Sequence, residues 1–257
     1  MTRFRIIINC GPCQDFIAQC LSSVMAQSLP DWDAYVTVDP CGDDTYRRAV
    51  QAARGDRRIH IRRNQIRRHS MYNHIQAIKR SHAAPEDVIA TLDGDDWLSD
   101  VHALRIIAAA YEEHDCWVTY GSWLSNVEGP TGRRDGAWPA YPEGTIDFRR
   151  HRFLGTAVRT WKKWLWDHLE DSDLRNQAGN YVRVSEDQMI MIPLLEMSGT
   201  SRARHIPEPI MVYNKLVQYP RDEDIDREGL GNGDLIDRRL PYPRLREKRY
   251  RSAAAAD

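Results

Sequence analysis

The stretch VIATLDGDDWL, residues 88–98, indicates most about the fold. An apolar run leads directly into three carboxylates, which is typical of a buried strand that ends at a polar edge. Asp93 and Asp95 point the same way in extended chain, and Gly94 between them permits a close backbone approach. Carboxylates this close repel one another unless a cation such as Mg²⁺ or Mn²⁺ offsets them. The stretch therefore predicts a metal site that a diphosphate could complete; the alternative is a turn of solvated acids before a helix.

Strands and helices alternate on either side of this stretch. Hydrophobic patterns predict strands at residues 5–9, 33–38, 58–62, 88–92 and 117–120, and helices at 16–25, 71–78, 99–111, 161–169 and 186–197, with Ser99 as an N-cap. This alternation predicts an α/β fold with a mostly parallel central sheet flanked by helices. Ligands on such sheets bind beyond the carboxyl ends of the strands, which here carry Asn9, Asp39 and Asp93.

A second group of acids begins the helix expected over residues 186–197. Ser185 and Gln188 form a capping-box pattern, and Pro193 is expected to kink or shorten the helix. Glu186 and Asp187 fall in the first turn, where the helix dipole favours carboxylates. Capping alone would explain them, but Asp187 could also serve as a general base that removes a proton from an incoming hydroxyl.

The composition is that of a folded protein without an overall attraction to polyanions. The chain has 257 residues, 42% of them hydrophobic, and a formal net charge of −1. No apolar run approaches the roughly 20 residues of a membrane span, and the first residues do not form a signal peptide. The five cysteines fit free thiols in a reducing compartment, so we expect a cytoplasmic protein.

Five short motifs follow one another along residues 4–215. After an apolar first strand come Leu21-Ser-Ser-Val-Met-Ala-Gln-Ser28, Val38-Asp39, Asp93-Gly-Asp-Asp96, Glu186-Asp187, and Pro207-Glu-Pro209 with Tyr213-Asn214. Each motif is weak by itself. Their common order and spacing resemble the family 2 glycosyltransferases, which have the GT-A fold of nucleotide-diphospho-sugar transferases.

The resemblance implies a non-processive, inverting glycosyltransferase. It would move a single sugar from a nucleotide-sugar donor, with UDP-sugars first in expectation, to a saccharide or other hydroxyl acceptor with Mn²⁺ or Mg²⁺ as cofactor. Asp187 would be the base, Asp95 with Asp93 would ligate the metal through the Asp-x-Asp motif, and Glu186 would lie on the acceptor side. The donor contacts would come from Asn9, Asp39, Arg68, Asp93 and Asp95.

The same resemblance divides the chain into three parts. Residues 1–125 would form a Rossmann-like half that binds the nucleotide sugar, and residues 126–218 a half that binds the acceptor and completes catalysis. Residues 219–257 form a charged tail, expected to be partly disordered. The family's usual Ala-Arg-Asn is replaced by Met71-Tyr-Asn73, so a diphosphate contact would fall to Arg68 or His69. The Gln-x-x-Arg-Trp motif of processive synthases is absent, which favours transfer of one sugar.

Several alternatives stay open at this stage. Cys10-Gly-Pro-Cys13 matches the motif of thioredoxin-like thiol-disulfide proteins, and a non-catalytic module that binds a nucleotide sugar is another candidate. Trp123 could stack on an acceptor sugar or simply pack in the core. Arginine-rich stretches at residues 57–68 and 149–163 could be solvated faces or could bind an anionic acceptor, so a nucleic-acid acceptor also stays open.

Overall fold

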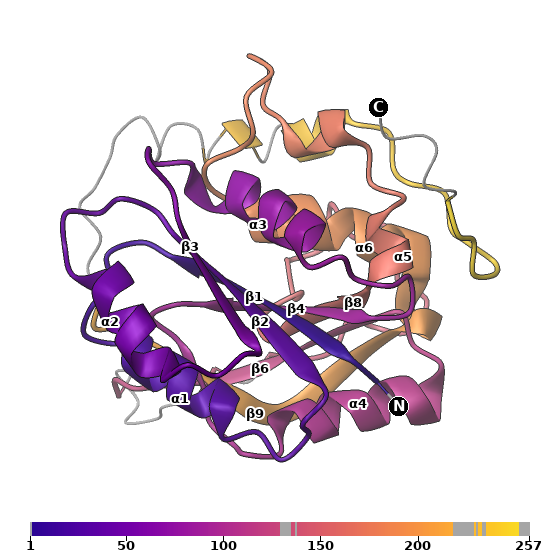
Figure 1. The fold of residues 1–257 in the computed structure, drawn as a ribbon. Helices are drawn as coiled ribbons and strands as arrows, with labels where there is room; N and C mark the ends of the chain where they lie inside the picture. The colour runs from indigo at the N-terminus through magenta and orange to yellow at the C-terminus, as the bar shows by residue number, and fades with distance from the viewer. Residues whose placement is uncertain are drawn as a thin grey trace.

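The computed structural model describes residues 2–128, 135–136, 138–217, 229, 231–232 and 235–251. Within these ranges one sheet runs in the order β3-β2-β1-β4-β8-β6-β9-β5, with β7 paired to β6 (Figure 1). Its strands are β1 (Phe4–Cys10), β2 (Trp32–Val38), β3 (Ile59–Arg63), β4 (Val88–Asp93), β5 (Trp97–Leu98), β6 (Val118–Ser125), β7 (Asp135–Gly136), β8 (Arg159–Lys162) and β9 (Ala203–Tyr213).

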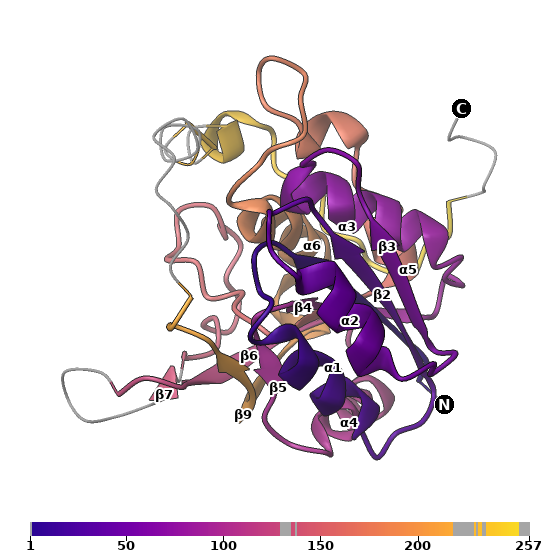
Figure 2. The ribbon, with the colours of Figure 1, turned by 60° about the vertical axis from the view of Figure 1, so that its left-hand side comes forward.

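Helices cover both faces of the sheet (Figures 1 and 2). They are α1 (Ile17–Met25), α2 (Thr45–Ala53), α3 (His69–Arg80), α4 (Ala103–His114), α5 (Lys163–Trp166), α6 (Glu186–Arg202) and the 3-10 helix η1 (Asp171–Leu174). Buried side chains of α1, α2 and α4 share one apolar cluster, and those of α3, α5 and α6 share another. The two clusters are therefore the cores on either side of the sheet.

The parallel half of the sheet forms as the sequence predicts. Strand β1 pairs in parallel with β2 and with β4, and β2 pairs in parallel with β3. Ile6 and Ile8 of β1 join the α1/α2/α4 cluster, while Ile7 joins the opposite one. A strand covered on both faces needs a continuous apolar run, which is why no polar alternation marks it.

The second half of the sheet is mixed. Strand β8 lies antiparallel between β4 and β6, and its Trp161 pairs with Ile89 on one side and Val118 on the other. The helix expected over residues 161–169 is therefore wrong in its first part, and only Lys163–Trp166 forms the short α5. Short apolar segments fit either a buried strand or a helix by pattern alone, and here pairing with two neighbours decides.

The helix expected from Ser99 begins later. Trp97 and Leu98 form β5, which pairs with β9, and Ser99 continues this contact by donating its hydroxyl to Pro209 O at 2.7 Å. Because that side chain binds β9, it cannot cap a helix, and α4 begins at Ala103. The Ser99 cap was thus a wrong prediction, and the sequence did not reveal β9.

Helix α6 begins at Glu186 as expected, but without a capping box. Ser185 has a left-handed backbone (φ 61°) and makes no side-chain hydrogen bond to the helix start. The helix continues through Pro193, and its backbone first departs from helical angles at Gly199 (φ 54°, ψ 177°). Glycine tolerates this positive φ, so the break occurs there rather than at the proline.

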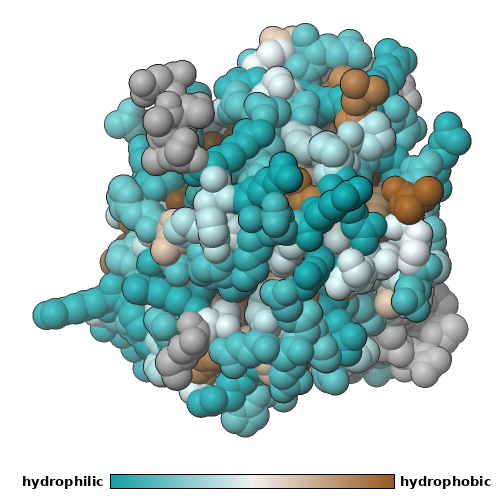
Figure 3. Space-filling view, turned by 90° about the vertical axis from the view of Figure 1, so that its right-hand side faces the viewer, coloured by the Kyte–Doolittle hydropathy of each residue, from teal (hydrophilic) through white to brown (hydrophobic). Residues whose placement is uncertain are grey.

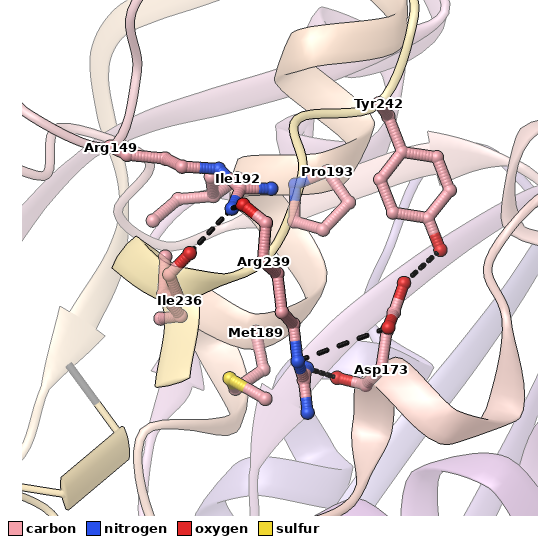
Figure 4. Close-up of a pocket in the computed structure, with 8 residues that line it drawn as sticks. All are labelled: Arg149, Asp173, Met189, Ile192, Pro193, Ile236, Arg239 and Tyr242. Carbon is pink, nitrogen blue, oxygen red and sulfur yellow. Dashed lines mark hydrogen bonds and ion pairs between the residues drawn. The ribbon is translucent and has the colours of Figure 1, made fainter. Parts of the chain in front are cut away.

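The described part of the C-terminal segment, residues 235–251, packs against α6 and η1 (Figure 4). Arg149 forms a buried ion pair with Glu196 of α6 (Nε–Oε1 2.6 Å) and also donates to the carbonyls of Ile236, Arg239 and Leu240. Tyr242 donates its hydroxyl to Asp173 Oδ2 at 2.6 Å and its backbone N–H to Glu196. This part of the predicted tail is therefore held by the fold.

None of the helices in the described ranges combines the length and apolar character that a membrane crossing requires. The face opposite the carboxyl ends of the parallel strands is mostly hydrophilic, with small separated hydrophobic patches (Figure 3). Ligands on such sheets bind at the opposite end, beyond the carboxyl ends of the strands, where Asn9 and Asp93 lie.

Candidate active site

The Asp93–Asp96 turn lies beyond the carboxyl ends of β1 and β4. Asn9 and Asp93 are partners in the register of these parallel strands, and Gly94 N donates to Asn9 O at 2.9 Å. A Cβ added to Gly94 would lie 2.5 Å from Cys10 Sγ, closer than real contacts allow. The turn therefore rests directly on the end of β1, and only glycine fits at its second position.

The first helical turn of α6 lies close to the Asp93–Asp96 loop. Burial, opposed by Arg159 and reinforced by Asp95 and Asp187, raises the pKa of Asp93 to about 6. Burial likewise raises the pKa of Glu186 to about 7, with Asp187 and Asp93 adding to the shift. Such mutual effects require the carboxylates to lie close together. The structure therefore brings Asp93, Asp95, Glu186 and Asp187 close together, and the roles predicted for them stay predictions.

Arg159 is the cation of this acidic group. It extends from β8, where it is the register partner of Thr91, and its Nη1 lies 3.6 Å from Asp187 Oδ2. Only 16% of its side chain is exposed. Arg159 was not predicted as a site residue, because the basic residues 149–163 were interpreted only as a possible charged surface.

A small cavity lies beside the first turn of α6 and Arg159. It is lined by His74, Thr91, Arg159, Trp161, Glu186, Asp187, Ile190 and Met191. A lining that combines carboxylates and a guanidinium with apolar side chains suits a small polar ligand.

Asp96 and Asn214 fix the turn to the end of β9. Asn214 N donates to Asp96 Oδ1 at 2.8 Å, and Asn214 Nδ2 donates to Asp95 O at 3.1 Å. Burial raises the pKa of Asp96 to about 8, with Asp93 adding to the shift. Asp96 therefore anchors the turn to the end of β9.

Asn9 and Asp39 both contact α3 or the turn before it. Asn9 Nδ2 lies 2.8 Å from His74 Nδ1, and Asp39 accepts hydrogen bonds from Asn64 Nδ2 (2.7 Å) and from the backbone N–H groups of Arg68 (3.1 Å) and His69 (2.8 Å). Asp39 thus helps to define where α3 begins. Their donor contacts stay predictions.

The remaining predicted residues border the site. Arg68 is exposed, with its guanidinium 5.0 Å from the ring centroid of Tyr72. Trp123 is half-buried beside Tyr213, with the ring centroids 5.2 Å apart. Burial raises the pKa of Tyr213, with smaller contributions from Asp96, Asp93 and Asp95, so Tyr213 lies near the carboxylates. Trp123 therefore flanks the acidic site.

The carboxylates suit a divalent cation only in part. Among the residues that the structure describes, no group of three or more His, Cys, Asp or Glu side chains could hold a metal ion. Asp93 and Asp95 nevertheless place buried, mutually repelling oxygen ligands at one spot. Mg²⁺ and Mn²⁺ commonly bind one or two carboxylates and complete their shell with phosphates and water, so this donor set fits such an ion.

The cysteine pair belongs to the core. Cys10 and Cys13 are each 2% exposed, and all five cysteines are free. The hydrogen bond with Cys13, followed by burial, raises the pKa of Cys10 well above its usual range. A reactive thiol needs the opposite, an accessible thiolate with a lowered pKa. The thioredoxin-like alternative therefore lacks support in the structure.

Comparison with known proteins identifies the family. The model of glycosyl transferase family 2 matches residues 6–165, more than half of the chain. The chain therefore belongs to glycosyl transferase family 2, and the predicted family and enzyme class are confirmed. No curated protein matches the chain by sequence.

Solved structures agree on the fold. S. aureus TarS 1–349 has a TM-score of 0.63 at 18% identity, over 83% of this chain and 60% of that one. TarS 1–349 in complex with UDP-GlcNAc has a TM-score of 0.62 at 16% identity, over 88% of this chain and 64% of that one. The mannosyltransferase PcManGT from Pyrobaculum calidifontis, in complex with GDP-Man and Mn²⁺, has a TM-score of 0.55 at 15% identity. The match covers 82% of this chain and 56% of that one. The predicted GT-A fold is confirmed, and the chain spans less than two thirds of these structures.

Proposed function

We propose that this chain transfers one sugar from a UDP-sugar to a hydroxyl acceptor by an inverting, metal-assisted displacement. The observation that carries the proposal is the proximity of two acidic groups, since the charges of Asp95 and Asp187 both act on Asp93. Asp93 and Asp95 lie at the end of β4, and Asp187 lies in the first turn of α6. One pair suits the donor diphosphate, and the other suits the acceptor hydroxyl.

Asp187 is the proposed general base. As the acceptor oxygen forms a bond to the anomeric carbon, its proton passes to a carboxylate oxygen of Asp187. The bond from that carbon to the diphosphate breaks at the same time, and the diphosphate leaves with the electron pair. Attack on the face opposite the leaving group inverts the anomeric configuration.

Asp95 and Asp93 are the proposed metal ligands. A bound Mn²⁺ or Mg²⁺ would supply positive charge that offsets the negative charge of the departing diphosphate. Arg159 keeps Asp187 paired within the cavity, and Asp96 with Asn214 keeps the Asp93–Asp96 turn in place. We further propose that Asn9, Asp39 and Arg68 contact the donor and that Glu186 and Trp123 lie on the acceptor side.

A UDP donor is supported by the TarS complexes with UDP and UDP-GlcNAc, and Mn²⁺ by the PcManGT complex. The proposed division gives residues 1–125 to the donor, 126–218 to the acceptor, and 219–257 to a tail. Five free cysteines suit a reducing compartment, so a cytoplasmic location is part of the proposal.

The test is calorimetric titration with UDP, GDP and dTDP, with and without Mn²⁺, followed by a transfer assay. We expect metal-dependent binding of UDP. Asp187→Asn should bind UDP normally and lose about 10²–10⁴-fold in transfer rate, the usual contribution of a general base. Normal transfer by this variant would contradict the base assignment. A wild-type protein that binds UDP but transfers no sugar to any acceptor would instead indicate a non-catalytic binding module.

A further inference from the structure

A basic segment lies beside the proposed donor site. Residues 57–85 contain eight Arg or Lys residues and no Asp or Glu, although the whole chain has a net charge of −1. The segment forms β3, the loop after it and α3, at the edge of the sheet (Figures 1 and 2). This segment is therefore locally strongly basic in a chain whose charges otherwise nearly cancel.

Four arginines present this charge to solvent. Arg62, Arg63, Arg67 and Arg68 are exposed; we name them the β3–α3 arginine surface. None of the four forms an ion pair with a carboxylate of any described residue, whereas their neighbour Arg58 is paired with Asp56. The positive charge of these four arginines is therefore not compensated by carboxylates of the described residues.

Behind this surface a fifth arginine is also uncompensated. Arg80 donates to Thr37 Oγ1 at 2.9 Å, but its Nε is buried with no partner among the described residues. Burial lowers the pKa of Arg80, and the nearby charge of Arg62 lowers it further. Within the described residues no carboxylate pairs with Arg62 or Arg80, which favours an external anion here.

The surface adjoins the carboxyl edge of the sheet. Arg63 is the register partner of Val38, and the backbone N–H groups of Arg68 and His69 bind Asp39, the next residue after Val38. A single donor diphosphate could occupy one or two arginines here. Four exposed arginines along the edge suit a ligand with repeating phosphates.

Aromatic rings are part of the same surface. The guanidinium of Arg63 lies 5.7 Å from the ring of Tyr46, which is 36% exposed, and that of Arg68 lies 5.0 Å from the ring of Tyr72. Rings between cations allow bases to stack while phosphates pair with the arginines, which is how proteins bind single-stranded nucleic acid.

We propose that the β3–α3 arginine surface binds single-stranded nucleic acid and holds it next to the sugar-transfer site as the acceptor. The inference rests on the proposed function for the acceptor role but not for the binding itself. Acceptor hydroxyls would then be presented by a polymer whose phosphates lie on the arginines.

The test measures binding of a fluorescent 12-nucleotide single-stranded DNA by anisotropy at several salt concentrations, without donor or metal. We expect a Kd in the micromolar range at low salt, with log K falling by about 0.7 per log unit of salt for each phosphate contacted. Arg62→Gln/Arg63→Gln should weaken binding at least tenfold and reduce the slope. Arg246→Gln/Arg249→Gln, a matched exposed pair in the C-terminal segment, should leave both unchanged.

Binding of inorganic polyphosphate and of anionic lipid vesicles distinguishes a nucleic-acid partner from other anionic partners. Tyr46→Ala should weaken binding of the oligonucleotide but not of inorganic polyphosphate. If polyphosphate or anionic lipid vesicles bind as tightly as the oligonucleotide, or if the two double variants behave alike, the proposal is overturned. UDP titration is independent of these measurements, so failure here and failure of the transferase proposal are distinguishable.

Discussion

Gly94 is the residue at which the Asp93–Asp96 turn and the core meet. Its missing side chain leaves room for Cys10 Sγ, which would lie 2.5 Å from an added Cβ. We expect Gly94→Ala to displace Asp93 and Asp95 and to weaken metal-dependent UDP binding by tenfold or more. Cys10→Ala/Gly94→Ala removes the sulfur and should recover part of the affinity. Equal affinity of the wild type and Gly94→Ala in calorimetry would contradict this packing argument.

Arg159 controls the charge state of the acidic group. Burial and neighbouring carboxylates raise the pKa of Asp93 to about 6 and that of Glu186 to about 7, and the positive charge of Arg159 limits both shifts. Arg159→Gln removes this charge, so both pKa values should rise and more of each group should be protonated near neutral pH. Protons compete with the metal for Asp93. The pH midpoint of Mn²⁺-dependent UDP binding should therefore move upward.

The control for this prediction is a nearby arginine that does not face the carboxylates. Arg175→Gln removes a guanidinium paired with Asp171 at the surface. Its pH midpoint should match that of the wild type. A midpoint that stays fixed in Arg159→Gln would show that Arg159 does not influence the metal ligands.

The sequence predicts individual site residues where a local pattern gives their position. Asp93 and Asp95 follow an apolar strand, and Asp187 begins a helix, so both groups could be assigned before the structure was known. Arg159 could not be predicted in this way, because its place in the cavity depends on antiparallel pairing with Thr91, 68 positions earlier. The residues next to Arg159 in the sequence give no indication of that pairing.

At the scale of elements, the turn before α6 is the part that positions Asp187. Ser185 holds a left-handed backbone, which costs a non-glycine residue roughly 1–2 kcal/mol. The preceding residue, Val184, is held through its carbonyl by Asn232 Nδ2 at 2.8 Å, and Asn232 is 1% exposed. The C-terminal segment thus secures the backbone next to the proposed base.

We expect Asn232→Ala to loosen this turn and to reduce kcat for transfer more than the affinity for UDP, because the donor ligands lie on β4. Amide hydrogen exchange should rise in residues 184–190 and stay unchanged in residues 88–98. Tyr250→Phe is the matched control, since it removes a C-terminal contact to Glu86 that does not involve α6. If both variants show the same exchange and kcat, Asn232 has no positioning role.

Elements with strong local patterns were predicted correctly, and those that depend on distant partners were not. The β1, β4 and α3 segments have continuous apolar runs or helical spacing, and each formed where expected. The two-residue β5 exists only because it pairs with β9, and this pairing delays α4 until Ala103. Short strands gain their stability from neighbours, so the sequence around them carries little information.

At the scale of the whole molecule, the Arg149–Glu196 pair joins three separate parts of the chain. Arg149 and Glu196 side chains are 8% and 3% exposed, and Arg149 also binds carbonyls of the C-terminal segment (Figure 4). Removal of one partner of a buried ion pair leaves an unpaired charge and costs about 3–5 kcal/mol. Arg149→Met should therefore reduce the free energy of unfolding by about that amount, measured by urea denaturation.

The double variant Arg149→Met/Glu196→Leu separates charge from packing. It leaves no unpaired carboxylate, so it should be more stable than Arg149→Met alone. It should not recover wild-type stability, because the carbonyls of Ile236, Arg239 and Leu240 still lose their donor. If the single and double variants unfold at the same urea concentration, the unpaired charge of Glu196 contributes nothing. The cost would then lie in the lost attachment of the C-terminal segment to the fold.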